Sequence, residues 1–307
     1  MLINADTLTS GSTRTSEVCV IGAGAAGITL ALELAGDGTT VTLLESGRVD
    51  PEAETQALYE GQNIGQPATT LDNPVTLDQT RLRYLGGTTN HWAGFCRPLS
   101  AVDFERRDHL AVSGWPIGLD DLLPHYERAA EWCRITDAEF DPDVWAERSG
   151  LPVPYPASGA VTPLVFQLTF PMPFGEVYRS DLATTPGLDV LLGANAVNLA
   201  TADGSRITGV DVRTLAGTEL RVEADRYVLA TGGIENARLL LASTDADPAG
   251  VGNTNDLVGR YFTEHLQVYA GFGVVESAAE QLAGLTGGEV TITGGRHAGA
   301  DHGVKYA

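Results

Sequence analysis

Residues 17–27 read EVCVIGAGAAG, and the class of fold follows from them. The apolar run over residues 17–21 predicts a short buried strand, and the glycines after it predict a tight turn into a helix over residues 28–35. Residues 40–44 (TVTLL) predict a second strand. Strand, glycine turn, helix and strand make one βαβ unit, so we expect a protein of the α/β class.

The spacing of the three glycines suits a bound dinucleotide. Gly22 allows the tight turn, Gly24 lets a pyrophosphate approach the backbone, and Gly27 lets helix and strand pack closely. The helix N-terminus supplies free N–H groups for phosphates. Glu45 follows Gly27 by 18 residues and closes the second strand, where a carboxylate can accept from ribose hydroxyls. The alternatives are an ordinary glycine-rich loop and a solvated acid at a strand end.

Length and charge limit the classes of function. The 307 residues leave room for about two domains. The net charge of −21 opposes binding to nucleic acid and to anionic membranes. We expect no membrane span, no metal site, buried reduced cysteines, a flexible polar tail over residues 1–15 and a cytoplasmic location.

Two later stretches are also rich in glycine. Residues 85–94 read LGGTTNHWAG, and residues 230–236 read ATGGIEN after a predicted buried strand. Adjacent glycines let a backbone lie flat against a ligand. The first of these stretches also fits a loop around a core tryptophan, and His91 alone is more often structural than reactive. If both stretches touch one ligand, the binding domain is discontinuous in sequence.

Taken together, GAGAAG, LLESG, LGGTTNHW, ATGGIENARLL and NDLVGRYFTEH resemble the glucose–methanol–choline (GMC) flavin oxidoreductases, in their bacterial sugar and polyol branch. The resemblance covers residues 17 to about 265. It implies FAD as the cofactor and oxidation of a CH–OH group of an alcohol or sugar by hydride transfer to flavin N5. The electron acceptor stays open.

By this resemblance two sets of residues hold FAD. The ADP half falls to Gly22, Ala23, Gly24, Ala25, Ala26, Gly27, Glu45 and Ser46, to the backbone of Val197, and to Thr231, Gly232 and Gly233. The pyrophosphate and the isoalloxazine ring fall to Gly86, Gly87, Thr88, Asn90, His91, Ala93 and Gly94. Some members of the family attach the flavin covalently to a histidine at the position of His91, and others with a similar stretch do not.

The catalytic histidine of the family has no counterpart that we can assign. Glu264 and His265 resemble a structural pair of the family, and we expect His297 and His302 to be inert. Family members are usually longer, so we expect this chain to be an N-terminal portion that holds FAD loosely and turns over slowly or not at all.

The expected architecture is a Rossmann-like FAD-binding domain with an interleaved α+β substrate domain. The first takes residues 16–110 and 188–265, and the second, incomplete, takes residues 111–187 and 266–307. Two alternatives remain. An NAD(P)-dependent dehydrogenase explains the first glycine turn but not the later stretches. A non-catalytic FAD-binding remnant, or a subunit that needs a partner chain, explains the missing histidine.

Overall fold

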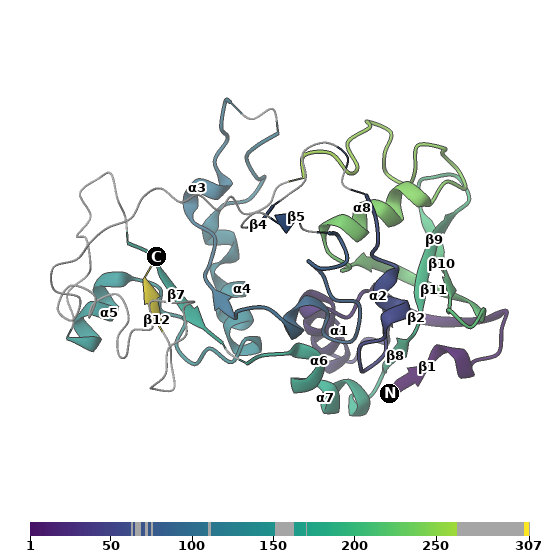
Figure 1. The fold of residues 1–307 in the computed structure, drawn as a ribbon, viewed down its shortest axis with the longest axis horizontal. Helices are drawn as coiled ribbons and strands as arrows, with labels where there is room; N and C mark the ends of the chain where they lie inside the picture. Colours follow the sequence, from purple (N-terminus) through teal and green to yellow (C-terminus); the bar gives the residue numbers. More distant parts are fainter. Residues whose placement is uncertain are drawn as a thin grey trace. The chain divides into compact units, whose positions relative to one another are not determined.

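The computed structural model describes residues 1–62, 64, 69–70, 73–74, 76–109, 112–150, 163–169, 171–262 and 304–306. The chain divides into two compact units, each assembled from two stretches of sequence (Figure 1). The first unit comprises Met1–His91 and Pro173–Thr263, and the second comprises Trp92–Met172 and Glu264–Ala307. Glu264, His265, His297 and His302 lie outside the described residues.

A seven-stranded sheet forms the centre of the first unit. Its first five strands run parallel to their neighbours, and its last two run antiparallel. In spatial order they are β1 (Leu2–Asn4), β8 (Leu188–Leu192), β3 (Val41–Glu45), β2 (Ser12–Ile21), β11 (Glu219–Leu229), β10 (Ile207–Arg213) and β9 (Asn195–Thr201) (Figure 1). The parallel pairing of β2 with β3 confirms the α/β class expected from the βαβ pattern.

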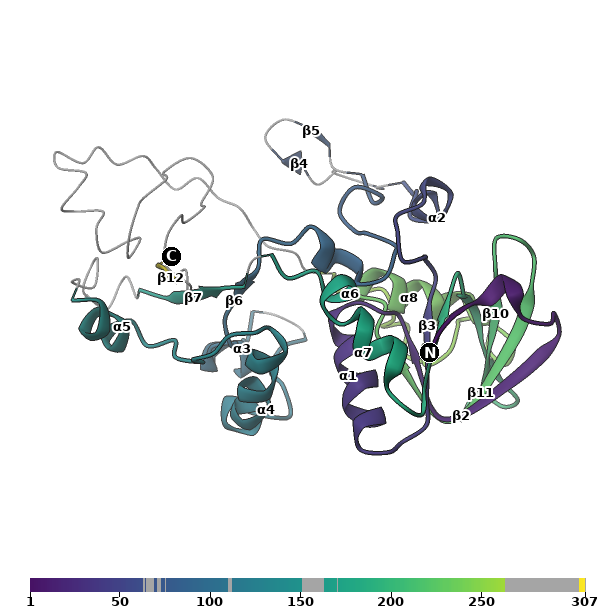
Figure 2. The same cartoon turned by 90° about the horizontal axis from the view of Figure 1, so that it is seen from below.

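Helices cover both faces of this sheet. α8 (Gly233–Ala242) places Leu239 in a core cluster with Ile21. Successive side chains of a strand point to opposite faces, so the fully buried Val20 belongs to the other face, where α1 (Ala25–Gly36) packs against β2, β3 and β8. α6 (Phe174–Val177) and α7 (Arg179–Thr184) lie beside α1 (Figures 1 and 2). The smaller elements of this unit are η1 (Ala5–Thr7), α2 (Ala53–Ala57), β4 (Thr69–Thr70), β5 (Asn73–Pro74), η2 (Gly87–Asn90), α6 (Phe174–Val177) and α7 (Arg179–Thr184).

The expectation of a flexible tail over residues 1–15 is wrong. β1 pairs with β8 through Leu2↔Val190, and β2 begins at Ser12, which pairs with Leu220 of β11. The first half of β2 alternates between exposed and half-buried side chains. Polar residues suit such a strand because the backbone ladder, not apolar burial, holds it in place.

The second unit holds a three-stranded sheet in the order β12 (Val304–Tyr306), β7 (Val165–Leu168) and β6 (Phe95–Cys96). Its helices are α3 (Ala101–Phe104), α4 (Leu119–Trp132) and α5 (Pro142–Ser149). The start of α4 is fixed by the Asp121 carboxylate, which accepts from the backbone N–H of Gly118, the residue before the helix.

The pairing of β6 with β7 also corrects the expected bounds of the two domains. The pairing brings residues 92–110 into the second unit, while α6 and α7 pack against α1 in the first. The boundaries between the units thus fall at 91/92 and 172/173, not at 110/111 and 187/188.

The three cysteines differ in their surroundings. Cys19 is fully buried, and burial raises the pKa of its thiol to about 12. Cys96 and Cys133 are half-buried, so the expectation that every cysteine is buried is wrong for these two. The described residues contain no cluster of His, Cys, Asp and Glu that could hold a metal ion, and none of their helices is long and apolar enough to cross a membrane.

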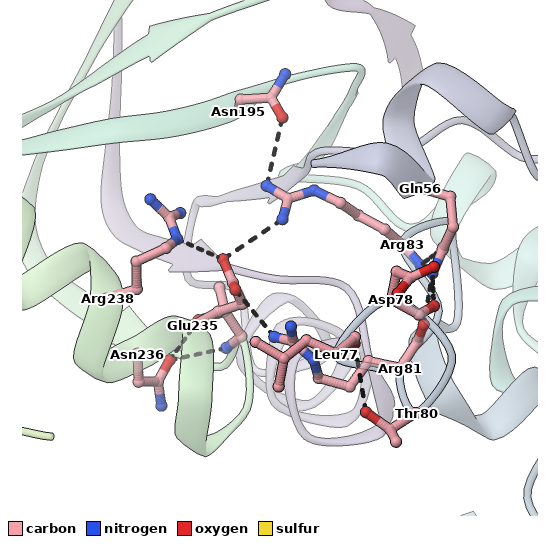
Figure 3. A network of polar contacts seen from close by, with 11 residues as sticks. Gln56, Leu77, Asp78, Thr80, Arg81, Arg83, Asn195, Glu235, Asn236 and Arg238 are labelled. Atoms are coloured by element: carbon pink, nitrogen blue, oxygen red, sulfur yellow. Dashed lines mark hydrogen bonds and ion pairs between the residues drawn. The ribbon is translucent and has the colours of Figure 1, made fainter. Parts of the chain in front are cut away.

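A buried carboxylate fastens the segment before η2 to α8 (Figure 3). Glu235, in the first turn of α8, accepts from Arg81 at 2.9 Å, from Arg83 at 3.4 Å and from Arg238 at 2.7 Å. Its side chain is 6% exposed. Burial raises the pKa of the Glu235 carboxyl, but hydrogen bonds from Arg238 and Arg81 and the nearby positive charges outweigh it, so the pKa lies below its usual value.

The close packing inside the βαβ unit predicts how a methyl group added at Gly27 changes the stability of the protein. A Cβ built on Gly27 would overlap the carbonyl oxygen of Gly22, whereas a Cβ on Gly36 of the same helix would meet no atom within 4 Å. We expect Gly27→Ala to lower the free energy of unfolding by about 2 kcal/mol or more. Gly36→Ala should leave it unchanged or raise it by about 0.5–1 kcal/mol. Equal denaturation midpoints for both variants would contradict this packing.

The Glu235 cluster predicts how stability depends on pH. A carboxyl whose pKa is lowered by folding stabilises the protein above its unfolded pKa, here 4.5, and this stabilisation is lost as pH falls through the folded pKa. We expect Glu235→Gln to destabilise the protein by about 2 kcal/mol at pH 7. The difference should shrink as pH falls below 4.5. Denaturant melts across this range test it, with the exposed Glu54→Gln as control; a constant difference would contradict the account.

Candidate functional site

One pocket of about 440 Å³ opens in the first unit where β2, β3 and β11 end. The carboxyl ends of parallel strands in α/β sheets are the usual place for a ligand, and the volume is within the range of small-molecule sites. The wall consists of Ile21, Gly22, Ala23, Gly24, Ala25, Ala26, Leu44, Glu45, Ser46, Tyr59, Leu82, Arg83, Gly87, Thr88, Thr89, Ala194, Ala196, Leu229, Ala230, Thr231, Gly232, Glu235, Asn236, Arg238 and Leu239.

The first glycine turn forms the floor of this pocket. Gly22 has a φ of +103°, which glycine adopts without strain, and its N–H donates to Leu44 O at 2.7 Å. The first amide bonded inside α1 is that of Ile28, which donates to Gly24 O at 2.9 Å. The amides of Ala25, Ala26 and Gly27 precede it and are the donors that an α-helix leaves free. They suit an anionic group.

Space at Gly24 supports the same conclusion. A Cβ on Gly24 would meet no protein atom within 4 Å, so the fold itself does not require glycine there. Gly27 and Gly86 differ, because a Cβ on either would strike protein backbone. The open space in front of Gly24 is therefore room for a ligand beside a bare backbone, and the donors around it fit a pyrophosphate.

Glu45 joins two loops of the pocket wall. One carboxylate oxygen accepts from Ala23 N at 3.0 Å, and the other accepts from Gly47 N at 2.7 Å. The residue is 6% exposed. Each carboxylate oxygen retains a further lone pair, so the group can still accept from a ligand hydroxyl at the pocket surface.

The second glycine stretch turns only part of itself to the pocket. Asn90 donates to Leu85 O at 3.0 Å and to Gly87 O at 2.9 Å, and Gly86 N donates to Ala23 O at 2.9 Å. These bonds fix η2 against the first glycine turn. Gly87 and Thr88 line the pocket, and so does Thr89, which the resemblance does not include among the residues that hold FAD.

The third glycine stretch is fixed by Asn236. The amide oxygen of Asn236 accepts from Thr231 N at 3.0 Å and from Thr231 Oγ1 at 2.6 Å. Gly232, with a φ of +86°, then leads into α8. This places the N-terminus of a second helix at the pocket, beside Thr231 and Gly232.

The expected site residues thus divide into three groups. Eleven line the pocket: Gly22, Ala23, Gly24, Ala25, Ala26, Glu45, Ser46, Gly87, Thr88, Thr231 and Gly232. Others lie in the same unit but outside the pocket wall: Gly27, Gly86, Asn90, His91, Val197 and Gly233. Ala93 and Gly94 belong to the second unit, where Gly94 packs against the backbone of Thr169.

Sequence reasoning also missed the charged and aromatic part of the wall. Tyr59, Arg83, Glu235 and Arg238 all line the pocket. A glutamate three residues before an arginine at a helix start was a visible signal for Glu235 and Arg238. No local pattern pointed to Arg83, because its partner Glu235 lies 152 residues further along the chain.

The chain is similar to several known proteins. The chain is 26% identical over 312 residues to 2-methyl-1,2-propanediol dehydrogenase of Mycolicibacterium austroafricanum, covering 82% of this chain and 55% of that protein. It is 25% identical over 344 residues to the fructose dehydrogenase large subunit of Gluconobacter japonicus, covering 89% and 62%. The chain thus spans little more than half the length of these curated relatives.

Among solved structures, pyridoxine 4-oxidase from Mesorbium loti matches with a TM-score of 0.49 and 18% identity, over 74% of this chain and 52% of that one. The model of the family described as FAD dependent oxidoreductase matches residues 17–249. That range includes the whole pocket wall and most of the chain. The chain therefore belongs to the family of FAD-dependent oxidoreductases.

Proposed function

We propose that the pocket of the first unit binds FAD and that the chain is the cofactor-binding part of a GMC-type oxidoreductase acting on CH–OH groups of alcohols or sugars. The single observation that carries the proposal is the pocket floor. It combines the free amides of α1, open space at Gly24 and the backbone-anchored carboxylate of Glu45. FAD, when bound, supplies the acceptor for a hydride from the CH–OH carbon.

The residues of the pocket have separate parts in this proposal. Amides at the start of α1 would hold the diphosphate, and the Glu45 carboxylate would accept from the ribose of the ADP half. Thr231 and Gly232, shaped by Asn236, would form the opposite side. Val197 directly follows Ala196, which lines the pocket, and the backbone of Val197 would serve the adenine.

The second glycine stretch would run along the rest of the cofactor. Gly87 and Thr88 would face it directly, while Gly27, Gly86, Asn90 and Gly233 would act by shaping the turns around it. By the sequence resemblance, Ala93 and Gly94 would lie beside the flavin.

The substrate and the proton acceptor belong to the proposal as well. The two relatives are named for a diol and a sugar, which supports alcohols or sugars as the substrate class. In the described part of the chain no histidine lines the pocket, so a general base would come from residues outside that wall. One relative is by name a large subunit, and a partner chain could supply that base.

The first experiment tests FAD binding at the pocket floor. Purified protein titrated with FAD should quench flavin fluorescence and carry an absorbance near 450 nm, which an NAD(P) enzyme would lack. We expect Gly24→Ala to weaken FAD by about tenfold or more, because the new methyl group occupies the approach to the backbone. Its unfolding midpoint should match that of the parent protein, since no protein atom lies near that methyl group.

Gly36→Ala is the matched control, because it adds the same methyl group in open space at the other end of α1. It should leave FAD affinity unchanged. Equal affinity of Gly24→Ala and Gly36→Ala would place FAD elsewhere, and absence of flavin binding by the parent protein would overturn the proposed function.

A separate experiment tests whether FAD is bonded covalently to His91. His91 is exposed and does not line the pocket, so we expect FAD to be held without a covalent bond. Acid precipitation should leave the yellow colour in the supernatant. Colour that stays in the pellet of the parent protein but not in that of His91→Ala would contradict this expectation.

A further inference from the structure

Arg83 is a buried cation whose donors are poorly matched. Its side chain is 9% exposed. Its two terminal nitrogens reach Glu235 at 3.4 Å and Asn195 Oδ1 at 3.5 Å, both at the long limit for a hydrogen bond (Figure 3). Its Nε is buried and has no acceptor among the described residues. Leaving guanidinium donors without good acceptors in a buried position is costly, so a missing acceptor is expected.

The surrounding charges do not supply that acceptor. Glu235 is shared with Arg81 and Arg238, which bind it at the shorter distances of 2.9 and 2.7 Å. One carboxylate therefore faces three guanidinium groups. Arg83 is the member of the trio with the longest contact to the carboxylate, and it lines the pocket.

The position of Arg83 is nevertheless well fixed. Its backbone N–H donates to Gln56 Oε1 at 3.0 Å. Its guanidinium lies 4.7 Å from the centre of the Tyr59 ring, and Tyr59 also lines the pocket. A planar guanidinium stacked on an aromatic ring presents its remaining donors in a defined direction. Such a group can read an acceptor on a ligand.

The neighbours of Arg83 indicate which part of a ligand it meets. Ala194 N donates to Glu45 O at 2.8 Å, so the start of β9 adjoins the strand end where the ribose would bind. Asn195, the next residue, is the acceptor of Arg83. Arg83 therefore stands beyond Glu45 on the nucleoside side, whereas the free amides of α1 suit the diphosphate.

We propose that Arg83 binds the adenosine half of FAD, donating from its guanidinium to an acceptor of the adenine ring or the ribose, with Glu235 holding it in place. The inference rests on the proposed FAD binding and adds a residue that selects the nucleoside. Adenosine offers acceptors at the ring nitrogens N1, N3 and N7 and at the ribose hydroxyls. The bound nucleoside thus offers a closer acceptor to the terminal guanidinium nitrogens, whose contacts within the protein are 3.4 and 3.5 Å long.

The experiment identifies the acceptor of the nucleoside that contributes to binding, and it asks whether Arg83 is the residue that contacts this acceptor. Dissociation constants are measured by displacement of FAD with ADP and with its 1-deaza, 3-deaza, 7-deaza, 2′-deoxy and 3′-deoxy analogues. In the parent protein, removing the contacted acceptor should weaken binding by about tenfold. In Arg83→Met, ADP itself should be weakened by a similar factor, and that one analogue should bind as well as ADP.

Arg83→Lys provides a second variant that keeps the charge and the bulk if Arg83→Met does not fold, and it should lose the same discrimination. Arg221→Lys is the matched control, because Arg221 pairs with Asp211 and Glu223 at 2.9 Å away from the pocket wall. It should keep the full discrimination of the parent protein. Glu235→Gln should reduce the discrimination, while Glu54→Gln should not, which separates positioning from general stability.

The outcomes separate this inference from the proposed function. If the parent protein binds FAD and every analogue is discriminated equally by the parent and by both Arg83 variants, the inference is overturned and FAD binding stands. If the parent protein does not bind FAD, the proposed function falls first. Loss of discrimination for one analogue in the Arg83 variants alone supports the inference.

Discussion

The contact between Gly27 and the carbonyl of Gly22 is the constraint on which the rest of the first unit depends. It brings α1 down onto the end of β2, so that the helix begins at the floor of the pocket. Gly22 N bonds to β3 through Leu44 O, and Ala230 N bonds to β2 through Ile21 O at 2.8 Å. Three strand ends and a helix start are thereby tied together, and the pocket is the space they leave.

Two buried carboxylates complete this pocket by different means. Glu45 is held by two backbone amides, so its geometry follows from the chain path of the βαβ unit itself. Glu235 is held by three arginines and draws the segment before η2 onto α8. The first is a local device that fixes one loop. The second is a long-range device, and its charge imbalance leaves donors for a ligand.

The sequence allowed the local parts of this account to be predicted and not the distant ones. The glycine turn, the helix after it and Glu45 lie within thirty residues and follow from spacing alone. The strand pairing of the N-terminal residues depends on β8 and β11, which lie far along the chain, so a polar stretch was misread as a tail. Arg83 and Tyr59 could not be predicted as pocket residues for the same reason, because their partners and the pocket wall come from separate segments of the chain.

Hydrogen–deuterium exchange with and without FAD measures most directly whether FAD occupies this pocket. If FAD occupies this pocket, amides at the start of α1, at Ala25–Gly27, and at the start of α8 should exchange more slowly with FAD present. Residues of β10, none of which lines the pocket, should be unchanged. Protection that is absent from both helix starts, with FAD bound, would contradict the account.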